Sequence, residues 1–252
     1  MLRKTDMRLL HTNDYVALDL ETTGLSPRDD RIIEIGAVRY IGGRRTEDFS
    51  CFVNPQIPIP ARITEITGID DAMVKDAPVI EDVLGKLLDF IGELPVLGHN
   101  IAFDYGFICQ KALNMKIKYK AKGIDTHRIS RSVLPQIESR SLENLCGYYH
   151  IVEEPRHRAL SDAAAAARLY NCLYEEAEAK DIEESSSLFM PADIAYTVKK
   201  DTPATAKQIA FLSSLIRRYR ISFDKEIETL TKSQASKEID KILSTYGRQL
   251  GV

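Results

Sequence analysis

The sequence has no long apolar run. No stretch approaches the roughly 18 consecutive apolar residues of a membrane span, although 44% of the 252 residues are hydrophobic. The first fifteen residues also lack the uninterrupted hydrophobic core of a cleaved secretion signal. We therefore expect a cytoplasmic protein without a membrane segment, long enough for one sizeable domain and a small appendage.

Cysteine is scarce and shows no pattern. The four cysteines, Cys51, Cys109, Cys146 and Cys172, include no Cys-x-x-Cys pair. This spacing argues against a disulfide framework and against a thiolate zinc site. We expect reduced, mostly structural thiols.

Basic residues are outnumbered in most of the chain. Residues 1–202 carry 25 Lys/Arg and 32 Asp/Glu, a balance of −7, whereas residues 203–252 carry nine and five, a balance of +4. An acidic body does not suit a protein that grips long duplexes by charge alone. It suits an enzyme whose acidic pocket is neutralised by bound cations. The basic tail either helps to capture a polyanion or is a solvated helical face.

Along the first 182 residues, the spacing of apolar residues is first typical of strands and then alternates between helix and strand. Short turns between Val- and Ile-rich stretches predict an antiparallel meander. Beyond it, helical spacing alternates with short strands, which implies right-handed parallel crossovers. The predicted strands are Tyr15–Leu20, Ile32–Arg39, Phe49–Val53, Pro95–Gly98 and Gly123–Thr126, and the predicted helices are Val79–Ile91, Ala102–Leu113, Ser141–Tyr149 and Ala159–Lys180.

The end of the chain has a different character. Residues 183–202 have no sustained period and are predicted to be a linker between a domain at 1–182 and a small module at 203–252. Within the module, Thr205-x-x-Gln208 and Thr231-x-x-Gln234 have the spacing of capping boxes. Apolar residues follow each box at helical intervals, so we expect a helical hairpin.

Two carboxylates share one face at the end of the first predicted strand. Alternation along Asp19-Leu20-Glu21 puts Asp19 and Glu21 on the same side. They repel one another and resist burial unless a cation joins them. The alternative is a solvated strand end with two acids of no special role.

Two further acids and a histidine begin later helices. Asp104 falls in a first helical turn, where a lone aspartate often only complements the helix dipole. This one lies beyond the end of a parallel strand, where the sheet changes from antiparallel to parallel and open sheets bind ligands. His157 and Asp162 bracket the start of the Ala-rich helix. A histidine there is often a surface or capping residue, but the following aspartate favours a functional pair.

Together these clusters supply four carboxylates and one histidine. Hard oxygen ligands without thiolates select Mg²⁺ or Mn²⁺ over zinc. Four carboxylates exceed what one octahedral ion needs, whereas two ions about 3.5–4 Å apart would serve in-line phosphodiester hydrolysis. The imidazole of His157, with an ordinary pKa near 6.5, is suited to take a proton from the attacking water.

In order and separation, the clusters resemble the motifs of the DEDDh, or DnaQ-like, exonucleases. This family includes the proofreading epsilon subunits of bacterial DNA polymerase III. The matching segments lie between Tyr15 and Glu175. They are Asp19-Leu20-Glu21-Thr22-Thr23-Gly24-Leu25, His99-Asn100-Ile101-Ala102-Phe103-Asp104 and His157-Arg158-Ala159-Leu160-Ser161-Asp162-Ala163. The histidine indicates the "h" subclass and not the tyrosine subclass.

The resemblance implies an α/β, ribonuclease H-like fold, with a five-stranded mixed sheet flanked by helices. It implies metal ligation by all four carboxylates, with His157 as general base. It also implies that Thr22 contacts the terminal 3′-hydroxyl, that Leu25 packs on the last base, and that His99 and Phe103 line the nucleotide pocket. At Thr67 proofreading subunits often have histidine, which leaves a role in replication open.

The resemblance implies 3′→5′ hydrolysis of single-stranded ends, dependent on two Mg²⁺ or Mn²⁺ ions and releasing nucleoside 5′-monophosphates. Such an enzyme would serve proofreading, repair or end trimming, with DNA favoured over RNA. One alternative is a catalytically silent module that binds 3′ ends, which we would expect to have lost a carboxylate or the histidine. Another is an RNA-trimming exoribonuclease. The expected partners are single-stranded DNA or RNA 3′ ends and, through 203–252, a replication or repair protein.

Overall fold

The computed structural model describes residues 11–152, 157–182, 187–196, 202–223 and 225–246. The chain divides into two compact units, Met1–Val198 and Lys199–Val252, and each is described by itself. Among the described residues, no helix is both long and apolar enough to cross a bilayer.

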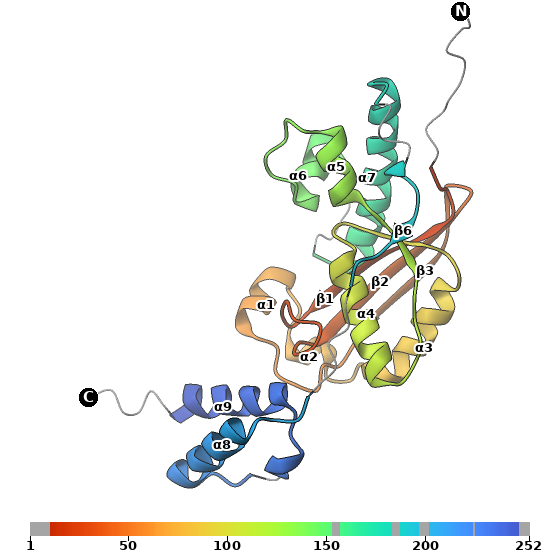
Figure 1. Cartoon of the computed structure of the whole chain (residues 1–252). Helices are drawn as coiled ribbons and strands as arrows, with labels where there is room; N and C mark the ends of the chain where they lie inside the picture. Colours follow the sequence, from red (N-terminus) through yellow and green to blue (C-terminus); the bar gives the residue numbers. More distant parts are fainter. Residues whose placement is uncertain (1–10, 153–156, 183–186, 197–201, 224, 247–252) are drawn as a thin grey trace, which may run out of the picture. The chain divides into compact units, whose positions relative to one another are not determined.

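The first unit is built on a mixed sheet (Figure 1). Its strand order is β3-β2-β1-β4-β5-β6. β1 pairs with β2 and β2 with β3 in antiparallel fashion, β4 runs parallel to β1 and to β5, and β6 closes the edge antiparallel to β5. The strands are β1 (Tyr15–Thr22), β2 (Ile32–Ile41), β3 (Arg44–Phe52), β4 (Val96–Gly98), β5 (Lys122–Asp125) and β6 (Ala192–Asp193).

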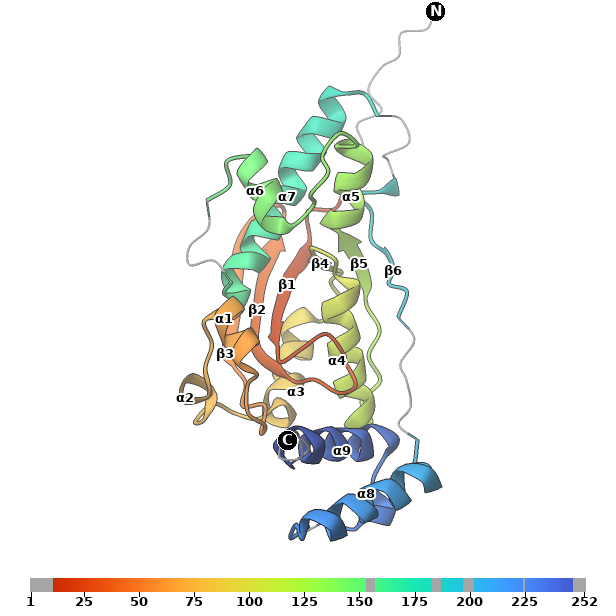
Figure 2. The same cartoon turned by 90° about the vertical axis from the view of Figure 1, so that its left-hand side faces the viewer.

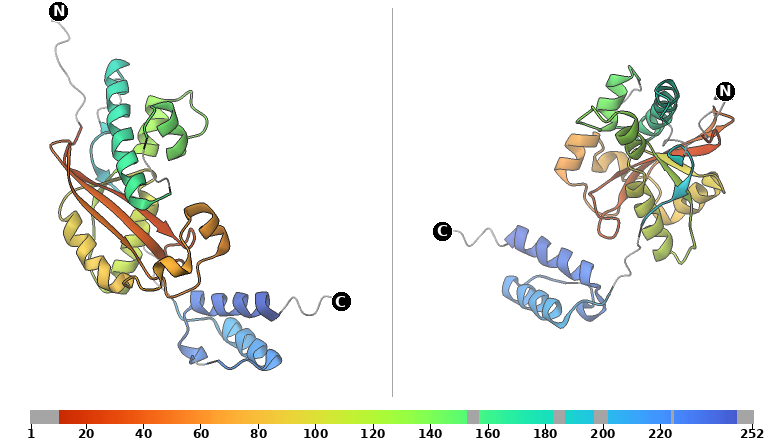
Figure 3. Two further views of the ribbon diagram at one scale, coloured as in Figure 1. Left: turned by 180° about the vertical axis from the view of Figure 1, so that it is seen from behind. Right: turned by 45° about the horizontal axis from the view of Figure 1, so that its top comes forward.

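Helices cover both faces of this sheet (Figure 2). They are α1 (Ala61–Thr67), α2 (Asp71–Val74), α3 (Ile80–Ile91), α4 (Ala102–Asn114), α5 (Thr126–Val133), α6 (Leu142–Tyr148) and α7 (Ala159–Ala179). Alternation along β1 sends Tyr15 and Ala17 into the core shared with α5, α6 and α7, and Val16 and Leu18 into the core shared with α3 and α4. Figure 3 shows α7 lying across the strands. By the same alternation, Asp19 and Glu21 fall on the α7 side.

The predicted ribonuclease H-like fold class is confirmed, with one correction. The prediction was five strands, and the part of the chain that the structure describes forms a sheet of six. The sixth, β6, has two residues and lies inside the segment 183–202 that was predicted to be a linker. A two-residue strand held by pairing with β5 has no hydrophobic period for the sequence to reveal. The short helices α1, α2 and α5 were also missed, because each has at most eight residues, too few helical turns for the spacing of apolar residues to identify.

The second unit is a helical hairpin with its own small core. It contains α8 (Ala206–Tyr219), a 3-10 turn (Ile227–Thr229) and α9 (Lys232–Tyr246). Both predicted capping boxes form: the amides of Gln208 and Gln234 donate to the threonine hydroxyls, and each glutamine side chain accepts from its threonine amide. Its buried apolar side chains are Leu212, Leu215, Leu230, Ala235, Ile239 and Ile242.

Candidate active site

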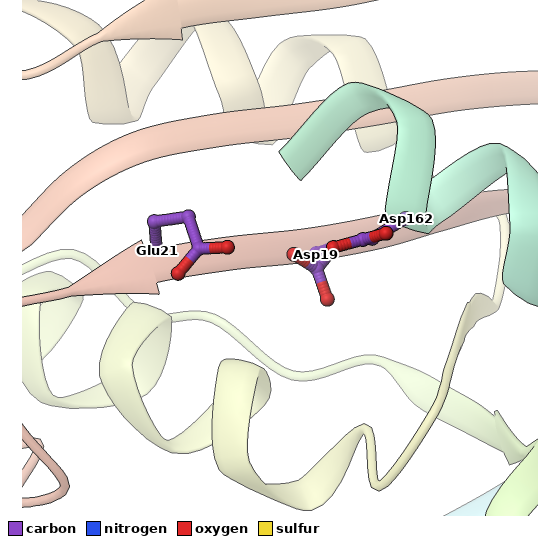
Figure 4. Close-up of side chains that lie close together, drawn as sticks. All are labelled: Asp19, Glu21 and Asp162. Atoms are coloured by element: carbon purple, nitrogen blue, oxygen red, sulfur yellow. The ribbon is translucent and has the colours of Figure 1, made fainter. Parts of the chain in front are cut away.

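Three carboxylates from two elements converge on one point (Figure 4). Asp19 and Glu21 project from the end of β1, and Asp162 projects from the first turn of α7. One oxygen from each lies within 4.8 Å of the other two. Carboxylate oxygens at such spacing form the donor set that binds divalent hard cations.

Gly36 lets α7 approach β1 this closely. It lies on β2 directly opposite Asp19. A Cβ at position 36 would lie 2.1 Å from the backbone carbon of Ala159 and 2.1 Å from the nitrogen of Leu160. Because no side chain fits at position 36, the backbone at the start of α7 packs directly against the backbone of β2. Asp162, one turn further along α7, therefore lies close to the carboxylates of β1.

An ion pair between Glu34 and Arg158 fixes the same helix start. Glu34 lies on β2 opposite Glu21 and is 2% exposed. It accepts from Nη2 of Arg158 at 2.7 Å, from Nε at 3.0 Å and from the amide of Ala159 at 3.2 Å. The guanidinium also lies 4.9 Å over the ring of Phe52. Arg158 directly follows His157. The two hydrogen bonds from its guanidinium to Glu34 therefore hold the backbone next to the histidine against the sheet.

Removing the arginine alone should destabilise the protein, because it leaves a buried, unpaired carboxylate. We expect Arg158→Met to cost about 3 kcal/mol of unfolding free energy, measured by urea unfolding at pH 7. The double variant Glu34→Gln/Arg158→Met should regain most of the lost stability. The oxygen of the new side-chain amide can still accept the hydrogen bond from the backbone N–H of Ala159. Arg45→Met, in an exposed pair with Asp48, should cost less than about 1 kcal/mol. Arg158→Met as stable as the parent would contradict the account.

Asp104 joins the cluster from α4. It is 4% exposed, and its Oδ1 accepts a hydrogen bond from the amide of Leu20, 3.0 Å away. Leu20 is the residue between Asp19 and Glu21, so the bond holds the α4 carboxylate beside β1. Burial raises the pKa of Asp104 to about 8.

Mutual repulsion and burial disfavour charge on the other acids too. Burial, then the neighbouring carboxylates of Asp104 and Asp162, raise the pKa of Asp19 well above its usual range. The pKa of Glu21 rises to about 7, because of burial first, then Asp162 and Glu34. Near neutral pH these groups are therefore poised to hold protons or bind cations in their place.

A cleft of about 330 Å³ opens over these carboxylates. All five predicted catalytic residues line it, as do two of the predicted substrate contacts. The set is Asp19, Glu21, Asp104, His157, Asp162, His99 and Phe103. Other lining residues, including Ser141, Glu143 and Ile151, were not predicted. They come from α6 and the segments around it, where the sequence carries no motif that would have identified them.

His157 stands at the rim of the cleft in an uncommon backbone conformation. Its side chain is exposed, and its φ is 55°, in the left-handed region. Few residues other than glycine adopt that region, and such positions cluster at functional sites. An exposed imidazole beside this half-buried carboxylate cluster is accessible to substrate and to water.

His99 is held mainly by the protein. Its Nδ1 lies 2.9 Å from the hydroxyl of Thr126, and its Nε2 lies 2.7 Å from the carbonyl oxygen of Arg140. Burial lowers the pKa of His99, which favours the neutral ring, and Nε2 donates to the Arg140 carbonyl because a carbonyl oxygen can only accept. Both ring nitrogens therefore have protein partners, and His99 lines the cleft.

Thr22 and Leu25 lie near the acids, but neither is among the described residues that line the cleft. The Thr22 side chain is buried, and its hydroxyl donates to the carbonyl of Gly24 at 2.7 Å. Leu25 is 84% exposed. A large apolar side chain so exposed is available to pack on a ligand, whereas the Thr22 hydroxyl would have to exchange its partner.

Comparison with known proteins identifies the family. The RNase_T family model, described as an exonuclease, matches residues 16–170. The chain belongs to this exonuclease family. It is 38% identical over 184 residues to the PolC-type DNA polymerase III of Caldanaerobacter subterraneus, covering 72% of this chain but 13% of that protein. It is 35% identical over 163 residues to the DNA polymerase III epsilon subunit of Aquifex aeolicus, covering 64% of this chain and 81% of that subunit.

Solved structures of exonucleases share the fold. Exonuclease X in complex with 5′ overhanging duplex DNA has a TM-score of 0.53 and 26% identity, covering 69% of this chain and 99% of that one. Escherichia coli exonuclease I in complex with a dT13 oligonucleotide has a TM-score of 0.59 and 17% identity, covering 68% and 43%. At that identity the likeness concerns the fold alone. The matches confirm the predicted DnaQ-like family and the ribonuclease H-like fold.

Proposed function

We propose that the protein is a metal-dependent 3′→5′ exonuclease that releases nucleoside 5′-monophosphates from single-stranded ends. The observation that carries the proposal is the convergence of Asp19, Glu21 and Asp162 within 4.8 Å, in a cleft that Asp104 and His157 also line. The proposed cofactor is a pair of Mg²⁺ or Mn²⁺ ions held by the four carboxylates, whose donor chemistry suits these ions.

In the proposed mechanism, the protein positions the phosphodiester and moves protons. When bound, two divalent ions supply positive charge that lowers the pKa of water and stabilises charge developing on phosphate. The hydrogen bond from the Leu20 amide holds the carboxylate of Asp104 in place. The close packing of α7 on Gly36 holds the carboxylate of Asp162 in place. Neither group therefore has to move before the reaction. His157 accepts the proton of the attacking water on its imidazole. Phe103 offers an apolar wall to the terminal nucleotide.

DNA is the proposed substrate, in a proofreading, repair or trimming role. The epsilon subunit of DNA polymerase III and the DNA complex of exonuclease X support this choice. The alternative of RNA rests on a fold neighbour described as a 3′-exonuclease that recognises the histone mRNA stem-loop, 20% identical. Reaction of matched DNA and RNA oligonucleotides distinguishes the two. A cytosolic location and a replication or repair partner of residues 203–252 stay predictions.

Release of mononucleotides from a 3′-labelled oligonucleotide tests the proposal directly. We expect the label to appear as a 5′-monophosphate with Mg²⁺ or Mn²⁺, and Asp19→Ala to lower turnover about 10³-fold or more. His157→Ala should lower turnover about 10²- to 10⁴-fold while metal affinity stays nearly unchanged. No release by the parent protein, or equal release by Asp19→Ala, would favour the catalytically silent alternative.

A further inference from the structure

The second unit presents an exposed helix face with one sign of charge. Helix α8 contains Lys207, Arg217 and Arg218 and has no aspartate or glutamate. Its buried side, Leu212 and Leu215, faces the small core of the unit. The face opposite that core is open to solvent.

An exposed aromatic residue sits among these cations. Phe211 is 47% exposed. At 100° per residue, Lys207, Phe211 and Arg218 fall within about 40° of one another around the helix, which places them in one row. The row spans about 16 Å at 1.5 Å per residue, the length of a few extended nucleotides.

Helix stability accounts for only part of this row. Cations at the end of a helix complement its dipole, which explains Arg217 and Arg218. Lys207, however, lies in the first turn, where a cation opposes the dipole. Solvation of the helix does not require an exposed phenyl ring, and solvated faces usually mix both signs of charge.

We propose that the α8 face, defined as Lys207, Phe211 and Arg218, is a second binding surface for single-stranded nucleic acid. Cations spaced along a groove or helix contact phosphates, and an exposed aromatic ring between them stacks on a base without selecting sequence. The charge of the face is complementary to a polyanion. The surface belongs to the second unit, beyond the residues 16–170 that the family model matches, and would bind the strand independently of the cleft.

Binding by the full-length chain in chelator-containing buffer tests the surface independently of hydrolysis. The probes are fluorescein-labelled dT20 and rU20, titrated at several salt concentrations. Lys207→Ala/Arg218→Ala should lower the slope of log affinity against log salt by about 1.4, because two phosphate contacts are lost at about 0.7 each. Lys86→Ala/Lys118→Ala, with the same charge change in the first unit, should leave the slope unchanged.

The phenyl ring is tested separately. Phe211→Ala should weaken binding of either probe about tenfold, and Phe211→Tyr should keep it, since tyrosine also stacks. With Mg²⁺, turnover of a trinucleotide should not change in any of these variants. The proposal would be overturned if Lys207→Ala/Arg218→Ala and Lys86→Ala/Lys118→Ala had equal salt slopes, or if Phe211→Ala and Phe211→Tyr bound the probes equally well. Either result would point to a protein occupant. Binding that behaves as expected in a protein without hydrolysis would overturn the proposed function and leave this inference standing.

Discussion

Replacing Asp104 with asparagine should abolish turnover and stabilise the metal-free protein. In the folded state burial raises the pKa of this carboxyl to about 8, whereas in the unfolded chain it titrates near 3.9. Between these values the native state holds a proton that the unfolded chain has lost. The stability that this proton contributes is complete below about pH 4 and is lost as pH rises through about 8.

Asparagine removes this dependence and keeps an oxygen to accept from the Leu20 amide. One unit of raised pKa corresponds to about 1.4 kcal/mol, so we expect Asp104→Asn to gain at least that much at pH 8. Below pH 4 the gain should vanish. Thermal unfolding between pH 4 and 8 in chelator measures it. Asp76→Asn, whose carboxylate is 90% exposed, is the control and should show no pH-dependent gain.

Divalent cations should reverse the order of stability. A metal that binds only the native state stabilises it by about 2.7 kcal/mol at a concentration 100 times its dissociation constant. The parent protein should therefore gain stability on adding Mg²⁺ or Mn²⁺, and Asp104→Asn should gain less. Strong destabilisation of the variant in metal-free buffer would show that Asp104 is a structural residue and would refute the argument from its raised pKa.

The sequence was sufficient for the parts of the site that local chemistry specifies. Asp19 and Glu21 follow from alternation along one strand, and His157 and Asp162 from a helix start. The structure brings these residues to one cleft. Their assigned roles stay predictions. The antiparallel meander, the longer helices and both capping boxes were also predictable, because each depends on residues close together in the chain.

Long-range packing was not readable in the same way. The role of Gly36 depends on α7, more than 120 positions away in the chain. Glu34 was not identified from the sequence, and only the fold shows that Arg158, 124 positions away, is its partner. The bond from Leu20 to Asp104 likewise joins residues 84 positions apart. The spacing of apolar residues predicts which face of a helix or strand a residue lies on. It does not predict which distant element packs against that face.

Gly36→Ala should damage both stability and catalysis, because its methyl group would enter the backbone of α7. A Cβ 2.1 Å from backbone atoms must move them by on the order of 1 Å, and overpacking of this kind costs about 3 kcal/mol. The same displacement carries Asp162 away from Asp19. A 1 Å misplacement of catalytic groups costs about 10²-fold in rate.

Gly85→Ala provides the matched control, since a Cβ there meets nothing within 4 Å and the residue lies in α3. It should gain about 0.5–1 kcal/mol from the lower entropy of the unfolded chain. Urea unfolding and the turnover of a labelled oligonucleotide measure both variants. If Gly36→Ala retained full turnover, the position of the α7 start would not control the site. If it lost turnover at unchanged stability, the helix would have moved without strain, and Asp162 alone would carry the loss.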